Sequence, residues 1–200
     1  MNFAAPAVTT TANTTVTLAQ IEAILADVPD PEIPVVSIRE LGILREVRLT
    51  DSGVEVVITP TYSGCPAMEQ IKDDVLTALA RHHIKATVIL QLAPAWTTDW
   101  ITPTARDKLR AYGIAPPHTV SPPEVSKTHK IQFATKNRAK YLYRTSANDQ
   151  FSSQNSLQEV NCPQCGSANT TETSHFGSTA CKALYKCLDC MEPFDYFKPY

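Results

Sequence analysis

The stretch LREVRLTDSGVEVVITPTYSGCPAMEQIKDDVLTALAR, residues 44–81, contains the strongest folding signals of the chain. Apolar and polar residues alternate over 44–49 and 54–59, and Asp51-Ser52-Gly53 lies between them, so we expect a β-hairpin. Pro66 suits the first position of a helix over 67–81. The residues expected on the buried face of that helix are Ile71, Val75, Leu76 and Leu79. A hairpin followed by an amphipathic helix predicts a domain that mixes α and β structure.

Further elements are expected on both sides of this stretch. Thr17 and Gln20 form a capping box in front of a helix over 18–26. The remaining expected elements are a strand over 35–38, a strand over 84–92, and a helix that Thr102-Pro103 opens and Gly113 ends. The order is then αβββαβα, which indicates an α+β fold in the form of an α/β sandwich, with helices against one sheet.

Composition narrows the class of protein. The chain has 200 residues, 43% of them hydrophobic, and a formal net charge of −2. No apolar run is long enough for a membrane helix, and the start of the sequence lacks the features of a secretory signal, so we expect a reducing cytoplasm. We expect residues 1–16 to be a disordered polar tail and residues 118–160 to be a flexible basic and polar linker.

Four cysteines near the C-terminus have the spacing of a metal site. Cys162 and Cys165 form one C-x-x-C pair, and Cys187 and Cys190 form a second. Two such pairs complete a tetrahedral four-sulfur shell, and the intervening residues can form one β-hairpin, so residues 161–200 are expected to be a small all-β zinc ribbon. A closed shell of this kind implies structural Zn²⁺, and an iron–sulfur cluster is the alternative. We expect aromatic side chains of the last strand to cover the metal, namely Phe194, Tyr196 and Phe197.

The remaining cysteines have several interpretations. Cys65 lies between a strand and a helix, where the helix N-terminus favours a thiolate, although a small buried residue at a tight turn is the alternative. Asp30 and Glu32 flank Pro31 and could ligate a hard metal or position a partner, or simply cap a turn. Cys181 lies outside the C-x-x-C pattern, as an unassigned thiol, an accessory ligand during metal exchange or a partner contact.

Several motifs resemble known families. Residues 28–34 (VPDPEIP), 41–43 (LGI) and 61–66 (TYSGCP) resemble the small α/β domain of iron–sulfur-assembly proteins of the SufT type. Residues 96–101 (WTTDWI), 109–117 (LRAYGIAPP) and 176–187 (FGSTACKALYKC) are similar to the PaaD (PaaJ) family of accessory subunits of the bacterial phenylacetyl-CoA 1,2-epoxidase system. The resemblance covers residues 17–117, as the iron–sulfur-assembly-like domain, and residues 160–200.

The resemblance implies a role in aerobic phenylacetate catabolism. In that family a di-iron subunit performs the oxygen chemistry and a flavin and iron–sulfur reductase supplies electrons, so the implied partners are the oxygenase and reductase subunits. The accessory subunit is thought to mature or maintain a metal centre of these partners, which implies a transient iron–sulfur cluster on this chain. By position, Cys65 matches the reactive cysteine, with Asp30, Glu32 and Thr61 beside it in the pattern. Cys181 matches the cysteine of the Phe-Gly-Ser-Thr-x-Cys stretch.

Other functional classes remain open on the sequence. The first alternative is a zinc-ribbon module that binds protein or nucleic acid without transferring metal, but the ribbon is slightly acidic, so we expect no nucleic-acid partner. A second is a thiol enzyme using Cys65, which needs a base that the neighbouring sequence does not offer. No Glu-x-x-His pair lies on an expected helix, as a di-iron site would need, so a non-catalytic accessory component is favoured over an enzyme. We expect no membrane partner, and a homo-oligomer is compatible with the sequence.

Overall fold

The computed structural model describes residues 8–9, 15–118 and 160–199. Its contacts group residues 1–120 with 159–200, and residues 121–158 form a second unit that lies outside the described residues. The linker predicted over 118–160 therefore lies outside the described residues except at its two ends. Within the predicted tail, β1 (Val8–Thr9) pairs antiparallel with β2 (Thr15–Val16), and the rest of the tail before β2 is also outside the description.

The predicted hairpin forms the centre of the first sheet. Strands β3 (Leu44–Thr50) and β4 (Gly53–Ile58) are antiparallel, and β5 (Ala86–Leu90) pairs parallel to β4, which gives the order β3-β4-β5. Gly53 begins β4 with a φ of 138°, and a Cβ atom there would lie 2.6 Å from the Lys85 carbonyl oxygen. The hairpin turn therefore needs glycine both for its backbone angle and for the close approach of the chain before β5.

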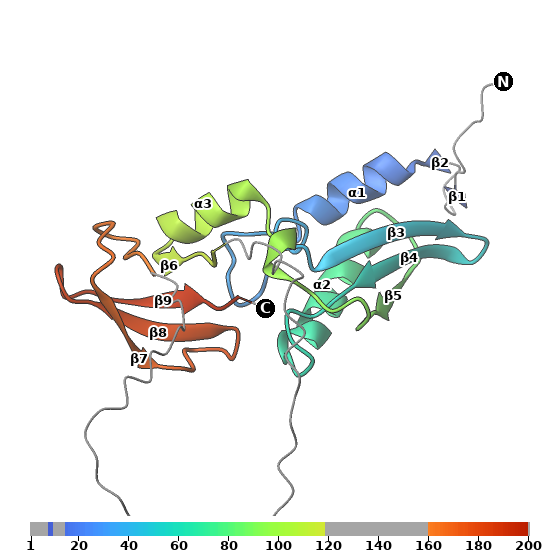
Figure 1. Cartoon of the computed structure of the whole chain (residues 1–200). Coiled ribbons are helices and arrows are strands. Elements are labelled where there is room, and N and C mark those ends of the chain that lie inside the picture. The colour runs from blue at the N-terminus through green and yellow to red at the C-terminus, as the bar shows by residue number, and fades with distance from the viewer. Residues whose placement is uncertain (1–7, 10–14, 119–159, 200) are drawn as a thin grey trace, which may run out of the picture. The chain divides into compact units, whose positions relative to one another are not determined.

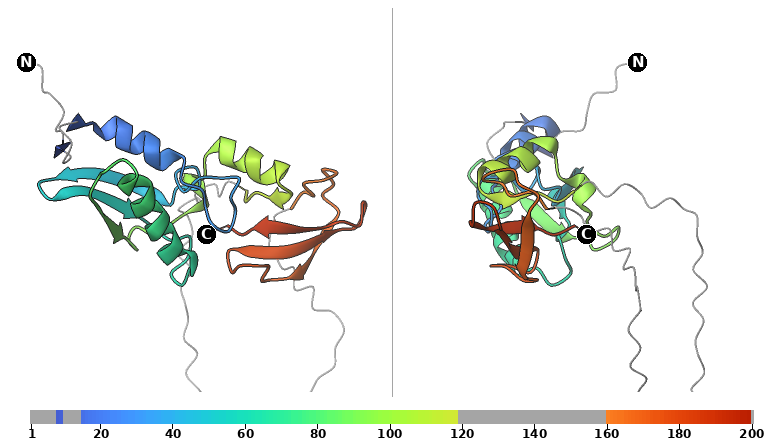
Figure 2. Two further views of the ribbon diagram at one scale, coloured as in Figure 1. Left: turned by 180° about the vertical axis from the view of Figure 1, so that it is seen from behind. Right: turned by 60° about the vertical axis from the view of Figure 1, so that its left-hand side comes forward.

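Two helices pack against this sheet. Helix α1 (Leu18–Ala26) contacts β3, and α2 (Ala67–Ala80) contacts β5 and α1 (Figures 1 and 2). The capping box of α1 is present, because Thr17 accepts from the Gln20 backbone N–H and its own N–H donates to the Gln20 side chain. The buried face of α2 contains Ile71, Val75 and Leu79 as predicted, with Leu76 half-buried.

The segment after α1 differs from the prediction. No strand forms over 35–38, where the structure has only one isolated bridge, between Pro29 and Ser37. The prolines at 29, 31 and 34 remove backbone donors that a strand ladder needs, and the chain folds into turns instead. The mixed α and β class is confirmed, but the element order of this domain has one strand fewer between α1 and the hairpin than predicted.

The chain then leads from the first sheet into the second. After the short 3₁₀ helix η1 (Thr98–Trp100), Thr102 caps α3 (Pro103–Ala111) by accepting from the Ala105 N–H, and Gly113 follows α3 with a φ of 93°. Both ends of this helix agree with the prediction. The helix leads directly into β6 (Ile114–Ala115).

The C-terminal segment forms a second sheet of order β6-β9-β8-β7. Its own strands are β7 (Thr170–Ser174), β8 (Lys182–Cys187) and β9 (Pro193–Phe197). Strand β8 pairs antiparallel with both β7 and β9, and β6 pairs parallel to β9. The ribbon sheet therefore takes its edge strand from the first half of the chain.

The hydrophobic core is also shared. Cys181 and Phe197 are buried in the cluster that holds the cores of α1, α2 and the first sheet, and Phe197 lies 6.0 Å from Trp96 between ring centroids. A second cluster surrounds the ribbon cysteines and includes Ala115 of β6. The core of the first domain thus contains residues from the ribbon, and the core of the ribbon contains Ala115 from the first domain.

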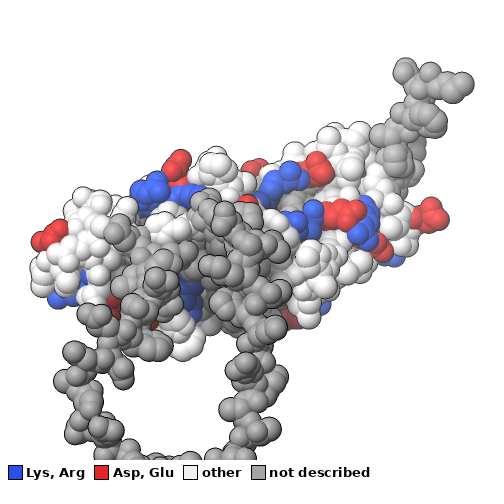
Figure 3. Space-filling model, in the orientation of Figure 1, with Lys and Arg blue, Asp and Glu red and all other residues white. Residues whose placement is uncertain are grey.

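The described surface carries charges of both signs. On the face drawn in Figure 3, Lys and Arg residues are interspersed with Asp and Glu residues. Among the helices of the described residues, none combines the length and hydropathy needed to cross a bilayer.

Candidate metal-handling sites

The four ribbon cysteines converge on one point. Their Sγ atoms lie within 4.8 Å of one another, with Cys162 and Cys190 at 3.7 Å and Cys165 and Cys187 at 3.6 Å. A tetrahedral zinc site with Zn–S bonds of about 2.3 Å places its sulfur atoms about 3.8 Å apart. The side chains present therefore fit a four-sulfur metal site, with no position left for a substrate.

The backbone around Cys187 favours a thiolate. The Cys190 N–H donates to the Cys187 sulfur at 3.5 Å, and the backbone N–H groups of Cys190 and Asp189 lower the pKa of Cys187 to about 7. Hydrogen bonds also stabilise the turn between Cys187 and Cys190, because Asp189 in that turn accepts from Ser167 and Asn169. Backbone hydrogen bonds also act on Cys165 and Cys190, but the neighbouring cysteine side chains raise the pKa of Cys165, and that of Cys190 to about 12, so a thiolate is favoured at Cys187 alone of these three.

Aromatic side chains cover the cluster, with one difference from the prediction. Phe194 and Tyr196 are buried beside Cys162 and Cys187, and Tyr185 contacts both rings, tilted against Phe194 and edge-on to Tyr196. Phe197, also expected over the metal, instead joins the core of the first domain. Because side chains alternate along β9, Phe194 and Tyr196 share one face of the strand and Phe197 lies on the other.

The second site surrounds Cys65, which lies between β4 and α2 as predicted. The side chain is partly exposed, the Cys65 N–H donates to the Tyr62 carbonyl at 3.1 Å, and Pro66 stands between it and the first residue of α2. Burial raises the pKa of the Cys65 thiol, and the charges of Glu32 and Asp30 raise it further, whereas the Ala67 N–H and the Tyr62 hydroxyl lower it. The expected thiolate at a helix N-terminus is therefore wrong for the free protein, because burial outweighs the helix end.

The acidic loop lies close enough to Cys65 to act on it. Asp30 is buried and its Oδ1 accepts from the backbone N–H groups of Glu32 at 3.0 Å and Ile33 at 2.8 Å. Burial nevertheless raises the pKa of Asp30, and burial together with the Asp30 charge raises that of Glu32. Asp30 thus caps the turn, Glu32 is the more accessible carboxylate, and Thr61 is buried.

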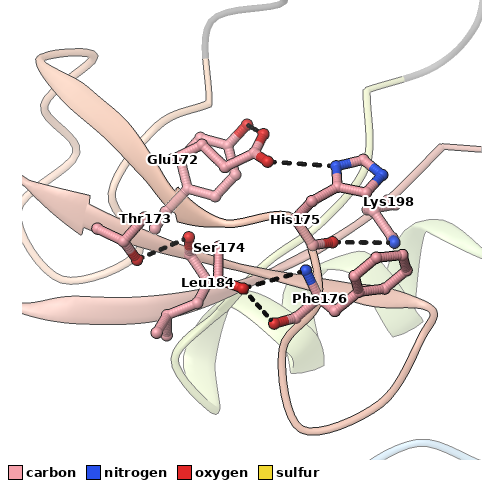
Figure 4. A network of polar contacts seen from close by, with 8 residues as sticks. Glu172, Thr173, Ser174, His175, Phe176, Leu184 and Lys198 are labelled. Carbon is pink, nitrogen blue, oxygen red and sulfur yellow. Dashed lines mark hydrogen bonds and ion pairs between the residues drawn. The ribbon is translucent and has the colours of Figure 1, made fainter.

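Cys181 does not lie with the ribbon cysteines. The loop between β7 and β8 brings it into the core of the first domain, against which Cys65 also packs. The bend at the start of this loop is held by Ser174, which donates to the Phe176 carbonyl at 2.8 Å, and by Lys198, which donates to the His175 carbonyl at 3.1 Å (Figure 4). The same loop carries Thr179, whose hydroxyl lies 3.0 Å from the Cys181 sulfur.

Sequence reasoning missed three residues of this second site. Lys182 is only 5% exposed, pairs with Asp195 at 3.4 Å, and its charge lowers the pKa of Asp30, Glu32 and Cys181. Tyr62 lowers the pKa of Cys65, and Thr179 lowers that of Glu32. The signal available for Lys182 was its place directly after Cys181, but nothing in the sequence showed which domain that loop would contact.

Comparisons with known proteins find relatives of both parts of the chain. Residues 18–88 match the family described as "Iron-sulfur cluster assembly protein", and residues 146–198 match "PaaD zinc beta ribbon domain". Solved structures similar to the chain include a domain of unknown function, DUF59, from Bacillus anthracis, at 27% identity and a TM-score of 0.43 over 46% of this chain and 89% of that one. A conserved hypothetical protein from Thermotoga maritima has 27% identity and a TM-score of 0.40 over 47% and 94%.

The two family matches describe the chain as an iron–sulfur cluster assembly domain joined to a zinc ribbon. One curated relative, from Escherichia coli (strain K12), is named as the D subunit of a putative 1,2-phenylacetyl-CoA epoxidase. It is 43% identical over 185 residues, which cover 90% of this chain and 91% of the relative. The chain belongs to this family of 1,2-phenylacetyl-CoA epoxidase D subunits.

Proposed function

We propose that this chain is an accessory subunit of a phenylacetyl-CoA 1,2-epoxidase system that matures or maintains an iron–sulfur or iron centre of its partners through Cys65. The name of the E. coli relative supports the system, and the match to the iron–sulfur-assembly family supports the task. The partners proposed are the reductase and oxygenase subunits.

The observation that carries this proposal is the setting of Cys65. It is a partly exposed thiol, next to the carboxylates of Asp30 and Glu32, in the domain that matches the assembly family. Its raised pKa keeps the sulfur protonated in the free protein, so an arriving metal must displace a proton, and reprotonation assists release. In this step the S–H bond breaks, a sulfur–iron bond forms, and Glu32 or water accepts the proton.

The ribbon has a different task in this proposal. Zinc held by Cys162, Cys165, Cys187 and Cys190 would stabilise the fold by constraining two distant knuckles, and it supplies no open coordination position. The two sulfur sites thus divide their roles: the closed site holds the structure together, and the open one at Cys65 handles metal in transit.

The test is the metal content of the partner subunits. Reductase and oxygenase subunits are purified from cells that carry the wild-type chain, Cys65→Ser, or the neighbouring control Ser63→Ala, and their iron and acid-labile sulfide are measured. We expect Cys65→Ser to leave the partners depleted and to prevent growth on phenylacetate, and Ser63→Ala to behave as wild type. Fully loaded partners in the Cys65→Ser strain would instead support the alternative of an interaction module that transfers no metal.

A further inference from the structure

We propose that strand β5 is the interface between two copies of this chain, which pair their β5 strands antiparallel about a two-fold axis at Val88. The pairing joins the three-stranded sheets of the two copies into one continuous sheet. This inference concerns how the chain assembles and goes beyond the proposed function, because it does not depend on metal handling at Cys65.

The first argument is a hydrogen-bonding edge that no other described strand uses. Strand β5 lies at one end of the order β3-β4-β5, and its only strand partner among the described residues is β4 (Figure 1). The Lys85 carbonyl accepts from β4 at 3.0 Å, and the Gln91 N–H donates to β4 at 2.9 Å. Backbone groups of successive residues point to opposite sides of a strand, so every second residue between these two also faces β4. The N–H and C=O groups of Ala86, Val88 and Leu90 therefore point out of the sheet edge.

The second argument is the composition of this edge. Residues 86–92 read ATVILQL and carry no charge. The exposed fractions of Leu90 and Leu92 are 53% and 57%, and Ile89 is exposed as well. Charged side chains and prolines normally keep an edge strand from pairing with another chain, and β5 has neither. Such an edge favours an uncharged, apolar strand as its occupant.

The third argument is a contrast with the other sheet edges. Strand β3, at the opposite edge of the same sheet, exposes Arg45, Glu46 and Arg48. Strand β7, at the outer edge of the ribbon sheet, is polar throughout and carries Glu172. Strands β1, β2 and β6 have two residues each. Among the strands that the structure describes, β5 is therefore the edge that is both long and unprotected.

A second copy of β5 supplies the backbone groups that this edge lacks. In an antiparallel pair centred on Val88, Val88 lies opposite Val88 of the other copy, and Ala86 lies opposite Leu90. All three residues direct their N–H and C=O groups outward, so each of these pairs is a hydrogen-bonded pair. Ala86 and Val88 already pack against the core of the first domain, and pairing extends the apolar surface on that face of the sheet.

The remaining side chains are also compatible with self-pairing. In the same register Thr87 lies opposite Ile89 of the other copy, and Lys85 lies opposite Gln91, so no like charges meet across the interface. The arrangement closes after two copies, because the free edge of each is then occupied by the other. The occupant is therefore a second copy of this chain, and the product is a two-fold dimer.

Analytical ultracentrifugation of the zinc-loaded full chain over a wide range of concentrations tests the dimer. We expect wild type to form a dimer that dissociates on dilution. An acidic variant, Thr87→Glu with Ile89→Glu, should dimerise at least about tenfold more weakly, because each new carboxylate meets another across the interface. A basic variant, Thr87→Lys with Ile89→Lys, should be weakened in the same way, and an equimolar mixture of the acidic and basic chains should form a heterodimer.

The control for added charge is Thr171→Glu, at an exposed position of β7, which should dimerise like wild type. Circular dichroism and zinc content establish that each variant is folded, and recovery of the heterodimer shows that both charged variants keep a functional edge. Hydrogen exchange then identifies the strand. The amides of Val88 and Leu90 should exchange at least about tenfold more slowly in wild type than in the acidic variant, whereas the Gln91 amide, which bonds to β4, should stay protected in both.

The outcomes are distinct from those of the iron measurement on the partner subunits, which tests the proposed function. A wild-type chain that stays monomeric at every concentration overturns the dimer. A dimer that the acidic variant leaves intact places the interface elsewhere and overturns the role of β5. If Val88 and Leu90 become protected only when the reductase or oxygenase subunits are added, the occupant is a strand of another polypeptide and self-pairing is wrong.

Discussion

At the scale of the residue, Cys65 experiences two opposed effects. Burial, the largest, raises its pKa, and the carboxylates of Glu32 and Asp30 add to this, whereas the Ala67 N–H at the start of α2 lowers it. The balance leaves a thiol at neutral pH, which suits a ligand that is deprotonated by an arriving metal.

Neutralising Glu32 should make this thiol more acidic. In Glu32→Gln the repulsive carboxylate charge is absent, so the pKa of Cys65 falls and alkylation by iodoacetamide reaches half its maximal rate at a lower pH than in wild type. The rate at Cys65 is followed against pH by peptide mass spectrometry. Glu22→Gln, on the exposed side of α1, is the control and should leave the profile unchanged. Coincident profiles for Glu32→Gln and wild type would show that Glu32 does not act on Cys65.

At the scale of the element, Gly42 fixes the turn that leads into β3. It has a φ of 72°, and a Cβ atom there would lie 2.5 Å from the Trp100 Cβ and 2.9 Å from the Trp100 carbonyl oxygen. We expect Gly42→Ala to lower the free energy of unfolding by about 2–4 kcal/mol, combining backbone strain with overpacking. Chemical denaturation measures this. Gly64→Ala, whose Cβ would meet nothing closer than Tyr62 at 3.9 Å, should change it little, and equal effects in both variants would refute the steric argument.

The ribbon depends on its metal ligands rather than on its small core. Replacing Cys187, which is fully buried among the four sulfurs, breaks a site of a type that contributes about 10–16 kcal/mol. We expect Cys187→Ser to lose its zinc and the hydrogen-exchange protection of β8 and β9. Leu188→Ser, at the exposed next position, should keep both. Undiminished zinc in Cys187→Ser would contradict the assignment of this ligand.

The elements that could be predicted are those whose ends are set by residues close together in the sequence. Thr17 and Gln20 cap α1, Gly53 turns the hairpin and Thr102 caps α3, each through residues within a few positions of one another. The strand expected at 35–38 does not form. Its apolar residues resemble those of a strand, but the nearby prolines and the turn that Asp30 caps determine the local backbone. In that segment the lack of backbone N–H donors at the prolines outweighed the β-strand propensity of the apolar residues.

At the scale of the whole molecule, the candidate sites differ in how far they could be predicted. The metal-binding role of the ribbon cysteines follows from their spacing alone, because two C-x-x-C pairs can place four sulfur atoms around one ion. The burial of Cys181 in the core of the first domain, and the action of the Lys182 charge on Asp30 and Glu32, depend on contacts between distant segments of the chain. Examples are the pairing of β6 with β9 and the packing of Phe197. No local pattern contains that information, so the sequence does not predict these contacts.

Phe197 offers the sharpest test of this shared core. Its ring is 1% exposed among residues of the first domain, and its centroid lies 6.0 Å from that of Trp96. We expect Phe197→Ala to lower the free energy of unfolding by about 3–5 kcal/mol, as measured by chemical denaturation. Because the loss falls on the contact between both halves, hydrogen-exchange protection should decrease in α3 and β6 as well as in β9.

The matched control is Phe176→Ala on the loop before β8. That ring is 64% exposed, lies 4.6 Å from the Lys198 ammonium and meets the His175 ring edge-on, so its removal should cost less than about 1 kcal/mol. If Phe197→Ala destabilises the ribbon strands and leaves α3 and β6 fully protected, the two halves fold separately. The packing that holds the Cys181 loop in the core of the first domain would then be dispensable for the fold of that domain.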